Sequence, residues 1–317
     1  MLKKAIILLV VLFFSLWGLE KLYGYFILQN KNVKSSYIST EKINADILIH
    51  GPCIPMWMVK PEILDEQTQL ISYNLSLSQS GYADSYLHFY LYLKNNKPPK
   101  YLFLYVTPES MDEKSALFGT YRFAPFLDDS IVANAVQEND PEYFKWTRIP
   151  FIKYGYYNNN INFNFIEGAK HFLTDRQTPY YRGGFEPPFK VDWDYQLEEL
   201  IKLHPQGTNF AWSSKEEKYL KKIIELAAQH HIIVYLYESP VLNEAKKYQL
   251  NRNEIINKIQ KIAEQYTIQY LLFDTMSVAN SRAYYFSPLS TNPKGSEIFS
   301  NEFGKYMKRE IIDKTTN

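Results

Sequence analysis

The sequence predicts an α/β fold, built on a doubly wound parallel sheet of about five strands, and three observations favour it. Short strands that are apolar throughout alternate with amphipathic helices, which is typical of a parallel sheet covered on both faces. The chain has 317 residues, enough to bury the core of one large domain or two small ones. Hydrophobic residues make up 46% and charged residues 22% of the chain, which excludes global disorder.

The amino-acid composition also disfavours several classes of function. Lys and Arg number 35 against 34 Asp and Glu, and the resulting net charge of +1 disfavours a nucleic-acid partner. The chain has 12 glycines and neither of the glycine-rich phosphate loops, G-x-G-x-x-G or G-x-x-x-x-G-K-[ST]. Its single cysteine excludes an internal disulfide framework and a cysteine-based zinc site. The sequence therefore predicts no cofactor and no metal.

Residues 1–28 are expected to form an N-terminal signal anchor or transmembrane helix. Two lysines precede an apolar run over 5–19, and a second apolar and aromatic run covers 22–28. The lysines favour an N-terminus inside the cell, so that the globular part lies in the periplasm or outside the cell. No small-x-small cleavage site follows, which favours a retained anchor over a cleaved signal peptide. A buried N-terminal helix is the remaining alternative, and we favour it least.

The polar segment 29–44 is expected to act as a tether, and the α/β domain is expected to span 45–312. Its strands are expected at 45–50, 70–75, 101–106, 231–237 and 269–273. Its main helices are expected at 82–93, 214–229, 254–265 and 294–307. This order of elements predicts the flavodoxin-like form of the doubly wound sheet.

Residues 108–212 do not follow the alternation and are expected to form an insertion after the third strand. This insertion is rich in Pro, Asn and aromatic residues. Because it leaves the end of the sheet where sites form, it would suit a lid or the wall of a groove, with exposed aromatics that stack on sugar rings. The interpretation that we favour is that these aromatics pack the insertion itself.

Acidic residues follow three of the expected strands. Ligand sites of doubly wound sheets form beyond the carboxyl ends of the strands, so Glu109, Glu238 and Asp274 could converge there. Paired carboxylates can run acid/base chemistry on glycosidic bonds or hold a cation. Such residues are also common as caps of the next helix, and we favour that interpretation.

Four stretches, by their order and spacing, are similar to motifs of the SGNH/GDSL hydrolase superfamily. Asp46 to Cys53 resembles its first strand and nucleophile turn, and Tyr73 to Ser78 resembles its second strand and oxyanion loop. Tyr101 to Glu109 resembles its third strand, and Tyr284 to Gly295 resembles the block that holds Asp-x-x-His. The likeness is greatest to its membrane-anchored extracytoplasmic branch, which includes alginate O-acetylation and teichoic-acid D-alanylation proteins. It implies a role in cell-envelope glycan O-acylation or deacylation, beside a multi-pass membrane O-acyltransferase.

The resemblance puts Cys53 at the nucleophile position, and Ser287 and Ser290 at the positions of the catalytic Asp and His. A serine hydroxyl is no general base at neutral pH, so the triad is expected to be degenerate. Pro52 also removes an amide donor of the kind that an oxyanion hole uses. The rim of the site is expected to consist of Gly51, Asn74, Ser78, Gly81, Glu109, Glu238 and Asp274.

A thiol at the nucleophile position would still need a proton acceptor. Of the six histidines, His50 is expected to point away from Cys53, and the pair at 230–231 ends a helix at the opposite end of the sheet. Only His171 and His204, on the insertion, could reach over the site. The favoured interpretation is a half-buried thiol in an inactive site.

We therefore expect a membrane-anchored, extracytoplasmic and SGNH-hydrolase-like protein that has lost its triad. It would bind a glycan or act as the partner of an O-acyltransferase. One alternative is an active esterase or O-acyltransferase that uses Cys53 as its nucleophile. Another is a structural or assembly protein with the insertion as its contact surface.

Overall fold

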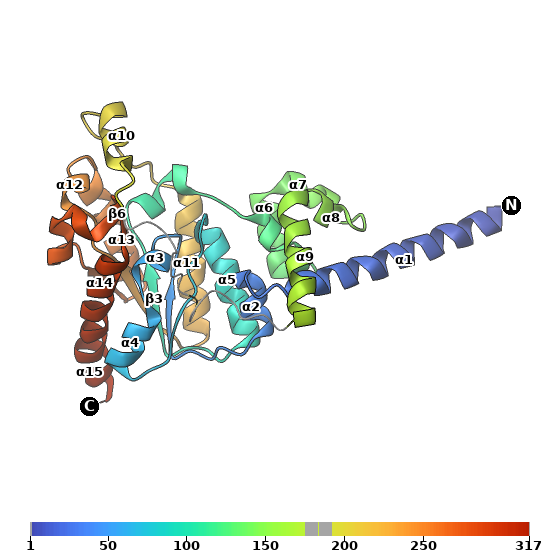
Figure 1. Cartoon of the computed structure of the whole chain (residues 1–317), viewed down its shortest axis with the longest axis horizontal. Helices are drawn as coiled ribbons and strands as arrows, with labels where there is room; N and C mark the ends of the chain where they lie inside the picture. The colour runs from blue at the N-terminus through green and yellow to red at the C-terminus, as the bar shows by residue number, and fades with distance from the viewer. Residues whose placement is uncertain (1, 175–182, 184–191, 317) are drawn as a thin grey trace. The chain divides into compact units, whose positions relative to one another are not determined.

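The computed structural model of the chain describes residues 2–174, 183 and 192–316 (Figure 1). The chain divides into two compact units. One combines Met1–Lys42 with Phe118–Pro179, and we call it the helical unit. The other combines Ile43–Leu117 with Tyr180–Asn317, and we call it the sheet unit.

The sheet unit is built on five parallel strands in the order β2-β1-β3-β4-β5. They are β1 Ile47–His50, β2 Ser72–Asn74, β3 Tyr101–Tyr105, β4 Ile233–Glu238 and β5 Gln269–Leu272. Each begins and ends within two residues of its expected position. The predicted class, a doubly wound parallel sheet, is confirmed.

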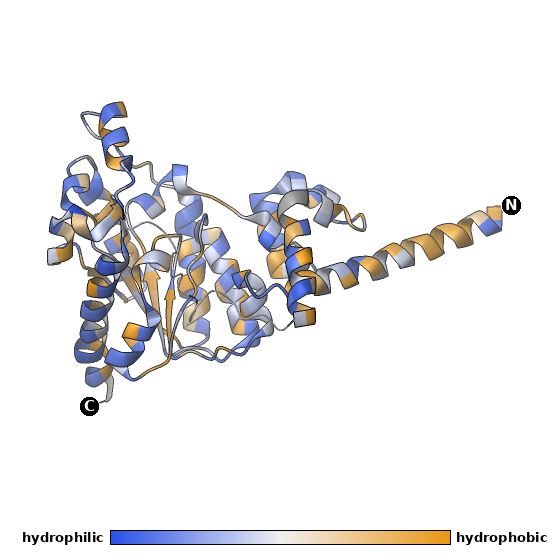
Figure 2. Cartoon of the chain, viewed as in Figure 1, coloured by the Kyte–Doolittle hydropathy of each residue, from blue (hydrophilic) through white to orange (hydrophobic). Residues whose placement is uncertain are grey.

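Burial on both faces explains why these strands are apolar throughout. Every residue of β1 and of β3 is buried. Successive side chains of a strand point to opposite faces, so a strand without polar positions needs cover on both sides. Ile47 and Ile49 pack on one face, in a cluster with Phe299 and Phe303. Figure 2 shows the hydrophobic strands between helices that carry hydrophilic residues.

Helices cover both sides of the sheet in Figure 1. On one side, α5 (Tyr82–Asn95) packs against α11 (Ser214–Gln229), and on the other α4 (Pro61–Thr68) packs against α14 (Pro293–Tyr306). Helix α13 (Arg252–Gln265) packs on the edge strand β5. The smaller elements of this unit are α3 Pro55–Met58, η1 Glu109–Met111, η2 Glu113–Ser115, α10 Gln196–Leu203, α12 Asn243–Lys246, η6 Ser277–Asn280, η7 Arg282–Tyr284, β6 Tyr285–Ser287, β7 Ser290–Thr291, η8 Met307–Ile312 and α15 Asp313–Thr316.

The helical unit is organised around the last turns of its first helix. Its elements are α1 Leu2–Leu28, α2 Lys34–Thr40, η3 Thr120–Arg122, η4 Ala124–Phe126, α6 Ser130–Asn139, α7 Pro141–Trp146, α8 Ile152–Gly155 and α9 Asn158–Thr174. The rings of Tyr23 on α1 and Phe165 on α9 stack with centroids 4.2 Å apart. A Cβ atom at Gly168 would lie 1.8 Å from the carbonyl oxygen of Phe26, so only glycine lets the two helices approach this closely.

Two expected boundaries differ from those of the structure. Segment 29–44 is not a free tether, because it contains α2 and buries Lys34, Ser36 and Ile38. The expected insertion 108–212 is divided, since Phe118–Pro179 belongs to the helical unit and 192–212 to the sheet unit. The reason is a shared core, in which Ile27 of α1 clusters with the buried residues Ala124, Tyr154 and Ile161. No local pattern reveals that two segments so far apart in sequence share a core.

Helix α1 is long and apolar enough to cross a membrane, by its length and composition. Residues 2–19 of it are exposed, and burial begins at Glu20. This is compatible with the expected single-pass anchor and equally with a signal sequence.

Candidate functional site at the carboxyl edge of the sheet

A glycine shapes the turn that follows β1. Gly51 has a φ of +142°, a conformation that residues with a side chain rarely adopt. A Cβ atom there would also lie 2.8 Å from Cβ of Tyr105. The chain therefore turns out of the sheet at this point and carries the partly exposed Cys53 beyond the carboxyl edge.

Cys53 has a hydrogen-bond donor beside it but no base. Nε1 of Trp57, on α3, donates to Sγ of Cys53 at 3.4 Å. No histidine or carboxylate among residues 2–174, 183 and 192–316 is hydrogen-bonded to this sulfur. The described surroundings of the thiol thus lack the proton acceptor that nucleophilic catalysis requires.

The histidines considered as bases have other surroundings. Nε2 of His50 hydrogen-bonds to the carbonyl oxygen of Ser85 at 2.8 Å, so this ring points toward α5, as expected. His171 belongs to the helical unit, where its Nδ1 accepts the backbone N–H of Lys31 at 3.0 Å. His204 is exposed at the C-cap of α10.

The hairpin β6–β7 holds Ser287 and Ser290, which the sequence resemblance aligns with a catalytic Asp and His. Ser287 and Ser290 pair across it, and both are buried. The hairpin segment lies against α3: the ring of Phe286 is 6.1 Å from that of Trp57, and Oγ of Ser296 donates to the carbonyl oxygen of Trp57 at 2.6 Å. The aligned segment therefore does lie next to the partner of Cys53, but with hydroxyls in place of titratable groups.

Two of the residues expected in or near an oxyanion loop, Asn74 and Gly81, have structural roles. Nδ2 of Asn74 donates to the carbonyl oxygens of Pro55 at 2.8 Å and of Val59 at 3.2 Å. This amide ties the end of β2 to both ends of α3 and is not available to a substrate. Gly81 is the N-cap of α5, and Ser78 is partly exposed in the bend between them.

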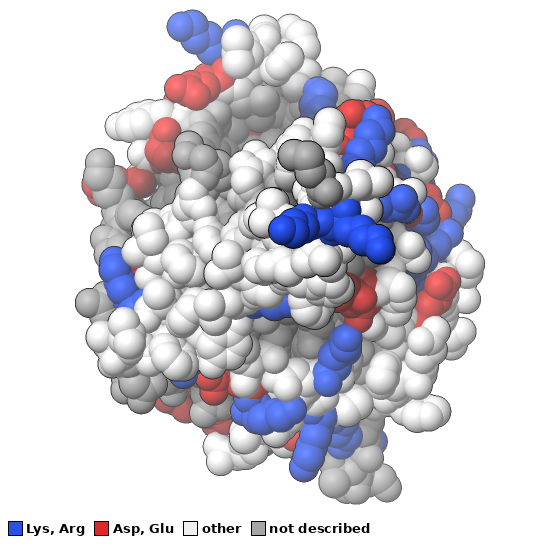
Figure 3. Space-filling view, turned by 90° about the vertical axis from the view of Figure 1, so that its right-hand side faces the viewer, with Lys and Arg blue, Asp and Glu red and all other residues white. Residues whose placement is uncertain are grey.

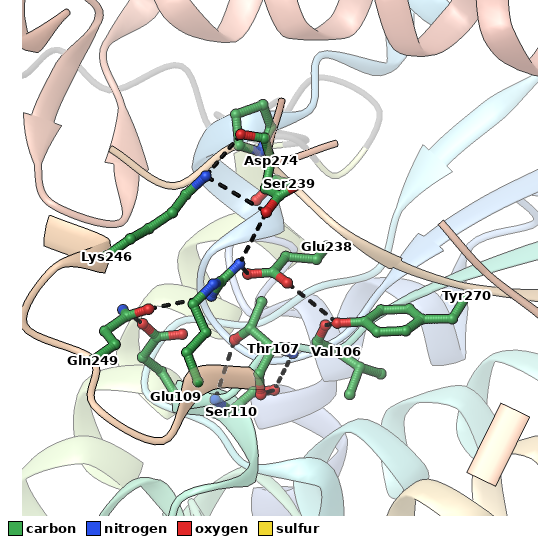
Figure 4. Close-up of polar contacts among 12 residues, drawn as sticks. Val106, Thr107, Glu109, Ser110, Glu238, Ser239, Lys246, Gln249, Tyr270 and Asp274 are labelled. Carbon is green, nitrogen blue, oxygen red and sulfur yellow. Dashed lines mark hydrogen bonds and ion pairs between the residues drawn. The ribbon is translucent and has the colours of Figure 1, made fainter. Parts of the chain in front are cut away.

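Glu238, the last residue of β4, converges with Glu109 and Asp274, which follow β3 and β5 (Figure 4). Oε1 of Glu238 lies 2.7 Å from Nη2 of Arg252, the first residue of α13, and Oδ2 of Asp274 lies 3.8 Å from the same nitrogen. Gln249 donates to Oε1 of Glu109 and accepts from Nη1 of Arg252 at 3.2 Å. One guanidinium thus connects the ends of three strands.

A lysine and a tyrosine complete this group. Nζ of Lys246 donates to the carbonyl oxygen of Asp274 at 2.7 Å and lies 3.6 Å from its Oδ2. The hydroxyl of Tyr270 lies 3.2 Å from Oε2 of Glu238 and 3.1 Å from the carbonyl oxygen of Val106. We call the following residues the carboxylate cluster: Glu109, Glu238, Lys246, Gln249, Arg252, Tyr270 and Asp274.

Burial dominates the electrostatics of the carboxylate cluster. Glu238 is fully buried, and this burial raises its pKa to about 7 although Arg252 opposes the shift. Burial also raises the pKa of Glu109, whose Oε2 has no hydrogen-bond partner among the described residues. The pKa of Lys246 is lowered by burial. The cluster thus sets three carboxyl groups against two basic side chains in surroundings that disfavour charge.

These carboxylates do not cap helices, so our favoured sequence interpretation of them is wrong. The N-caps of the elements that follow are Pro108, Leu242 and Met276, and none of these ends has a side-chain cap. The physical reason is Arg252, whose guanidinium forms charge-assisted contacts that are stronger than a hydrogen bond to a neutral amide.

Arg252 is also the residue that our sequence reasoning missed. It is the first residue of α13, where the helix dipole disfavours a cation. A basic residue at a helix start therefore signals an acidic partner elsewhere. Lys246 and Gln249 lie in the connection before α13, for which the sequence predicted no element.

No group of three or more His, Cys, Asp or Glu side chains in the described part of the chain is arranged to hold a metal ion. In the carboxylate cluster, Arg252 and Lys246 already supply the positive charge. No protein-family model matches this chain, and no curated protein matches its sequence. Its fold and the chemistry of this edge are therefore the grounds for a functional proposal.

Proposed function

We propose that this chain is a membrane-tethered, SGNH-hydrolase-like domain that acts by binding rather than by acyl transfer. The observation that carries the proposal is the Cys53 turn, where Sγ accepts a hydrogen bond from an indole and is bonded to no base of the described residues. The strand order β2-β1-β3-β4-β5 and the glycine turn after β1 support the choice of scaffold. Domains of this topology bind their ligands at the carboxyl edge, where this turn lies.

The chemistry of acyl transfer argues in the same direction. Attack by Cys53 on an ester would need a group to accept the thiol proton, and the Trp57 indole is a donor only. The tetrahedral intermediate would need amide donors, but Asn74 uses its amide on two carbonyls and Pro52 has none. A general base contributes roughly 10²–10⁴-fold and an oxyanion donor roughly 10²–10³-fold to such reactions.

The ligand that we propose is a cell-envelope glycan, presented to a multi-pass membrane O-acyltransferase. The resemblance of the four sequence stretches to the extracytoplasmic branch of the superfamily motivates this choice. Helix α1, long and apolar enough to cross a membrane, would hold the sheet unit close to such an enzyme. The proposal places that unit on the outer side, in accord with the lysines that precede the apolar run.

Ester turnover by the full chain in nanodiscs tests the catalytic part of the proposal. We expect p-nitrophenyl acetate to be hydrolysed at the same slow rate by the natural chain and by Cys53→Ala. Mass spectrometry should find no acyl group on the thiol, and the assignment is unambiguous because the chain has one cysteine. Turnover that Cys53→Ala abolishes would replace this proposal with an esterase or O-acyltransferase that uses Cys53.

Binding to envelope polysaccharide tests the other part. The same nanodiscs are titrated with O-acetylated fragments and with the same fragments after alkaline deacetylation. We expect saturable binding that survives Cys53→Ala and is lost in Cys53→Trp, because the larger ring would fill the turn. The matched control is Leu203→Trp, at an exposed position of α10, which should bind normally. Equal binding by all these variants, or none, would contradict a glycan site at this turn.

A further inference from the structure

The helical unit has large apolar side chains that are exposed to solvent. We call six of them the collar: Tyr25, Trp146, Ile149, Ile166, Phe172 and Leu173, all exposed. Leu173 alone leaves 77% of its surface exposed. Scattered exposed hydrophobics are ordinary, but a group of this kind within one small unit marks an interaction surface.

The collar residues of α9 lie on the side nearer the exposed part of α1. The opposite side of α9 reaches past the end of α1, where Asn164 bonds to Asn30 and His171 to Lys31. Ile166 and Leu173 each come two residues after one of these, which turns them to nearly the opposite side of the helix. The ring of Phe172 accordingly contacts that of Tyr25, with centroids 6.0 Å apart.

A buried ion pair ties the segment that follows Trp146 and Ile149 to the end of the exposed apolar run. Oε1 of Glu20 lies 2.7 Å from Nζ of Lys153, and both side chains are less than 10% exposed. Oε2 of Glu20 accepts the backbone N–H of Phe151 at 2.8 Å. Phe151 and Lys153, which follow Trp146 and Ile149 in the sequence, are thereby fixed at the level of Glu20. The first carboxylate of α1 is thus neutralised and covered at the point where the exposed run ends.

The length of α1 shows why this level matters. At 1.5 Å per residue, the apolar run 5–19 spans about 22 Å, whereas the hydrocarbon core of a bilayer is about 30 Å thick. The remaining ~8 Å corresponds to about five residues, which extends the span to Gly24 and Tyr25. Gly24 is buried and the ring of Tyr25 contacts that of Phe172, so both residues already pack against the rest of the helical unit. A full span therefore brings the collar down to the lipid.

We propose that the collar lies in the interfacial region of a lipid bilayer, so that the helical unit is partly embedded in the membrane. The inference rests on the proposed membrane anchoring by α1. Trp and Tyr side chains, such as the exposed Trp146 and Tyr25, prefer this depth. Figure 3 looks from the N-terminal side of α1, and uncharged residues dominate the surface in view. The collar makes up the hydrophobic length that α1 lacks by itself.

Lipid-borne quenchers test this proposal in the full chain. In a Cys53→Ala background, Leu173→Cys is labelled with bimane, and the protein is placed in phosphatidylethanolamine–phosphatidylglycerol vesicles. Some of the lipid carries a nitroxide at a shallow acyl position. We expect several-fold stronger quenching of this label than of one at Leu203→Cys in the sheet unit. Leu203 is the matched control because it is 73% exposed and is also a leucine near the end of a helix.

Each outcome supports or overturns the collar. A label at residue 173 that responds like the one at 203, and that aqueous iodide reaches equally, overturns it. Protection from both lipid and aqueous quenchers also overturns it, because a second copy or another membrane protein would then cover the surface. A label at Val11→Cys separates the two proposals: if deep nitroxides quench it while the 173 label stays in water, the anchor stands and the collar fails. If Val11→Cys is not quenched either, the anchoring itself fails.

Discussion

The Cys53 turn and the carboxylate cluster share the carboxyl edge of one sheet, yet they differ in every chemical respect. The turn presents a partly exposed thiol between an indole and the buried serine hydroxyls of a hairpin. The cluster gathers three carboxylates and two cations, and its centre, Glu238, is completely buried. Among the described residues, no base is hydrogen-bonded to the thiol where a motif predicts chemistry, whereas the titratable groups at the ends of the neighbouring strands are bonded to one another. We interpret the turn as the part of this edge that a ligand can reach. The cluster, in contrast, stabilises the fold by connecting the ends of three strands.

Loss of the central cation should have the largest effect. Arg252→Met would leave Glu238 buried without its partner at 2.7 Å, and removal of one member of a buried pair costs about 3–5 kcal/mol. Urea unfolding of the full chain in detergent measures this free energy. The control is Arg309→Met, which removes an exposed pair and should cost less than about 1 kcal/mol. If the two variants have equal free energies of unfolding, the cluster does not stabilise the fold as we argue.

The glycine turn should be the next most sensitive feature. Gly51→Ala places a side chain at a φ of +142° and against Tyr105, which should destabilise the fold by about 1–3 kcal/mol. At Gly155 an added Cβ would meet nothing within 4 Å, so Gly155→Ala should be neutral or slightly stabilising. The same unfolding measurement compares the two. If Gly51→Ala unfolds like the natural chain, the turn is less constrained than we argue.

The raised pKa of Glu238 predicts a pH dependence. This pKa is about 7 in the folded chain against 4.5 for an ordinary glutamate, so between these values the folded state keeps a proton that the unfolded chain has lost. The resulting stability is fully present below pH 4.5 and is lost as the pH rises toward 7, by up to about 1.4 kcal/mol per unit. Burial raises the pKa of Glu216 to about 7 as well, so it contributes in the same direction.

Unfolding at pH 5, 6 and 7 checks this dependence. Glu238→Gln should reduce the slope of the free energy of unfolding against pH, while the remaining slope belongs to groups such as Glu216. Glu302→Gln, which changes an exposed residue of α14, should leave the slope unchanged. A Glu238→Gln chain that keeps the natural slope would remove Glu238 from this account.

The smallest effect is expected at the turn itself. Cys53→Ser keeps an acceptor for the indole N–H of Trp57 on a partly exposed side chain, so the free energy of unfolding should change by less than about 1 kcal/mol. It also introduces the hydroxyl nucleophile of the superfamily that the sequence resembles, but with no base bonded to this position among the described residues we expect no gain of ester turnover over Cys53→Ala. A gain would reveal a proton acceptor near this turn.

Much of the fold could be predicted because it depends on neighbours in the sequence. The apolar run of β3 and the spacing of apolar residues in α11 predict which side chains are buried. Both elements lie within one residue of their expected bounds. The site was less predictable. Cys53 follows a strand that the sequence predicted, but the partner of Glu238 lies 14 residues further on, at the first residue of α13, and the predicted helix began only at residue 254. Its only signal was a basic residue at the start of α13.

By itself the sequence determined the parallel sheet, the membrane-compatible helix and the glycine turn, because hydrophobic periodicity and backbone sterics act over a few residues. Only the tertiary structure decided which distant segments share a core. It joined Phe118–Pro179 to the end of α1 rather than to the sheet, and it brought Arg252 between the carboxylates at the ends of three strands. The physical reason is that the burial of a side chain depends on which segments pack around it. The raised pKa of Glu238 and the exposure of the collar side chains therefore follow from tertiary packing.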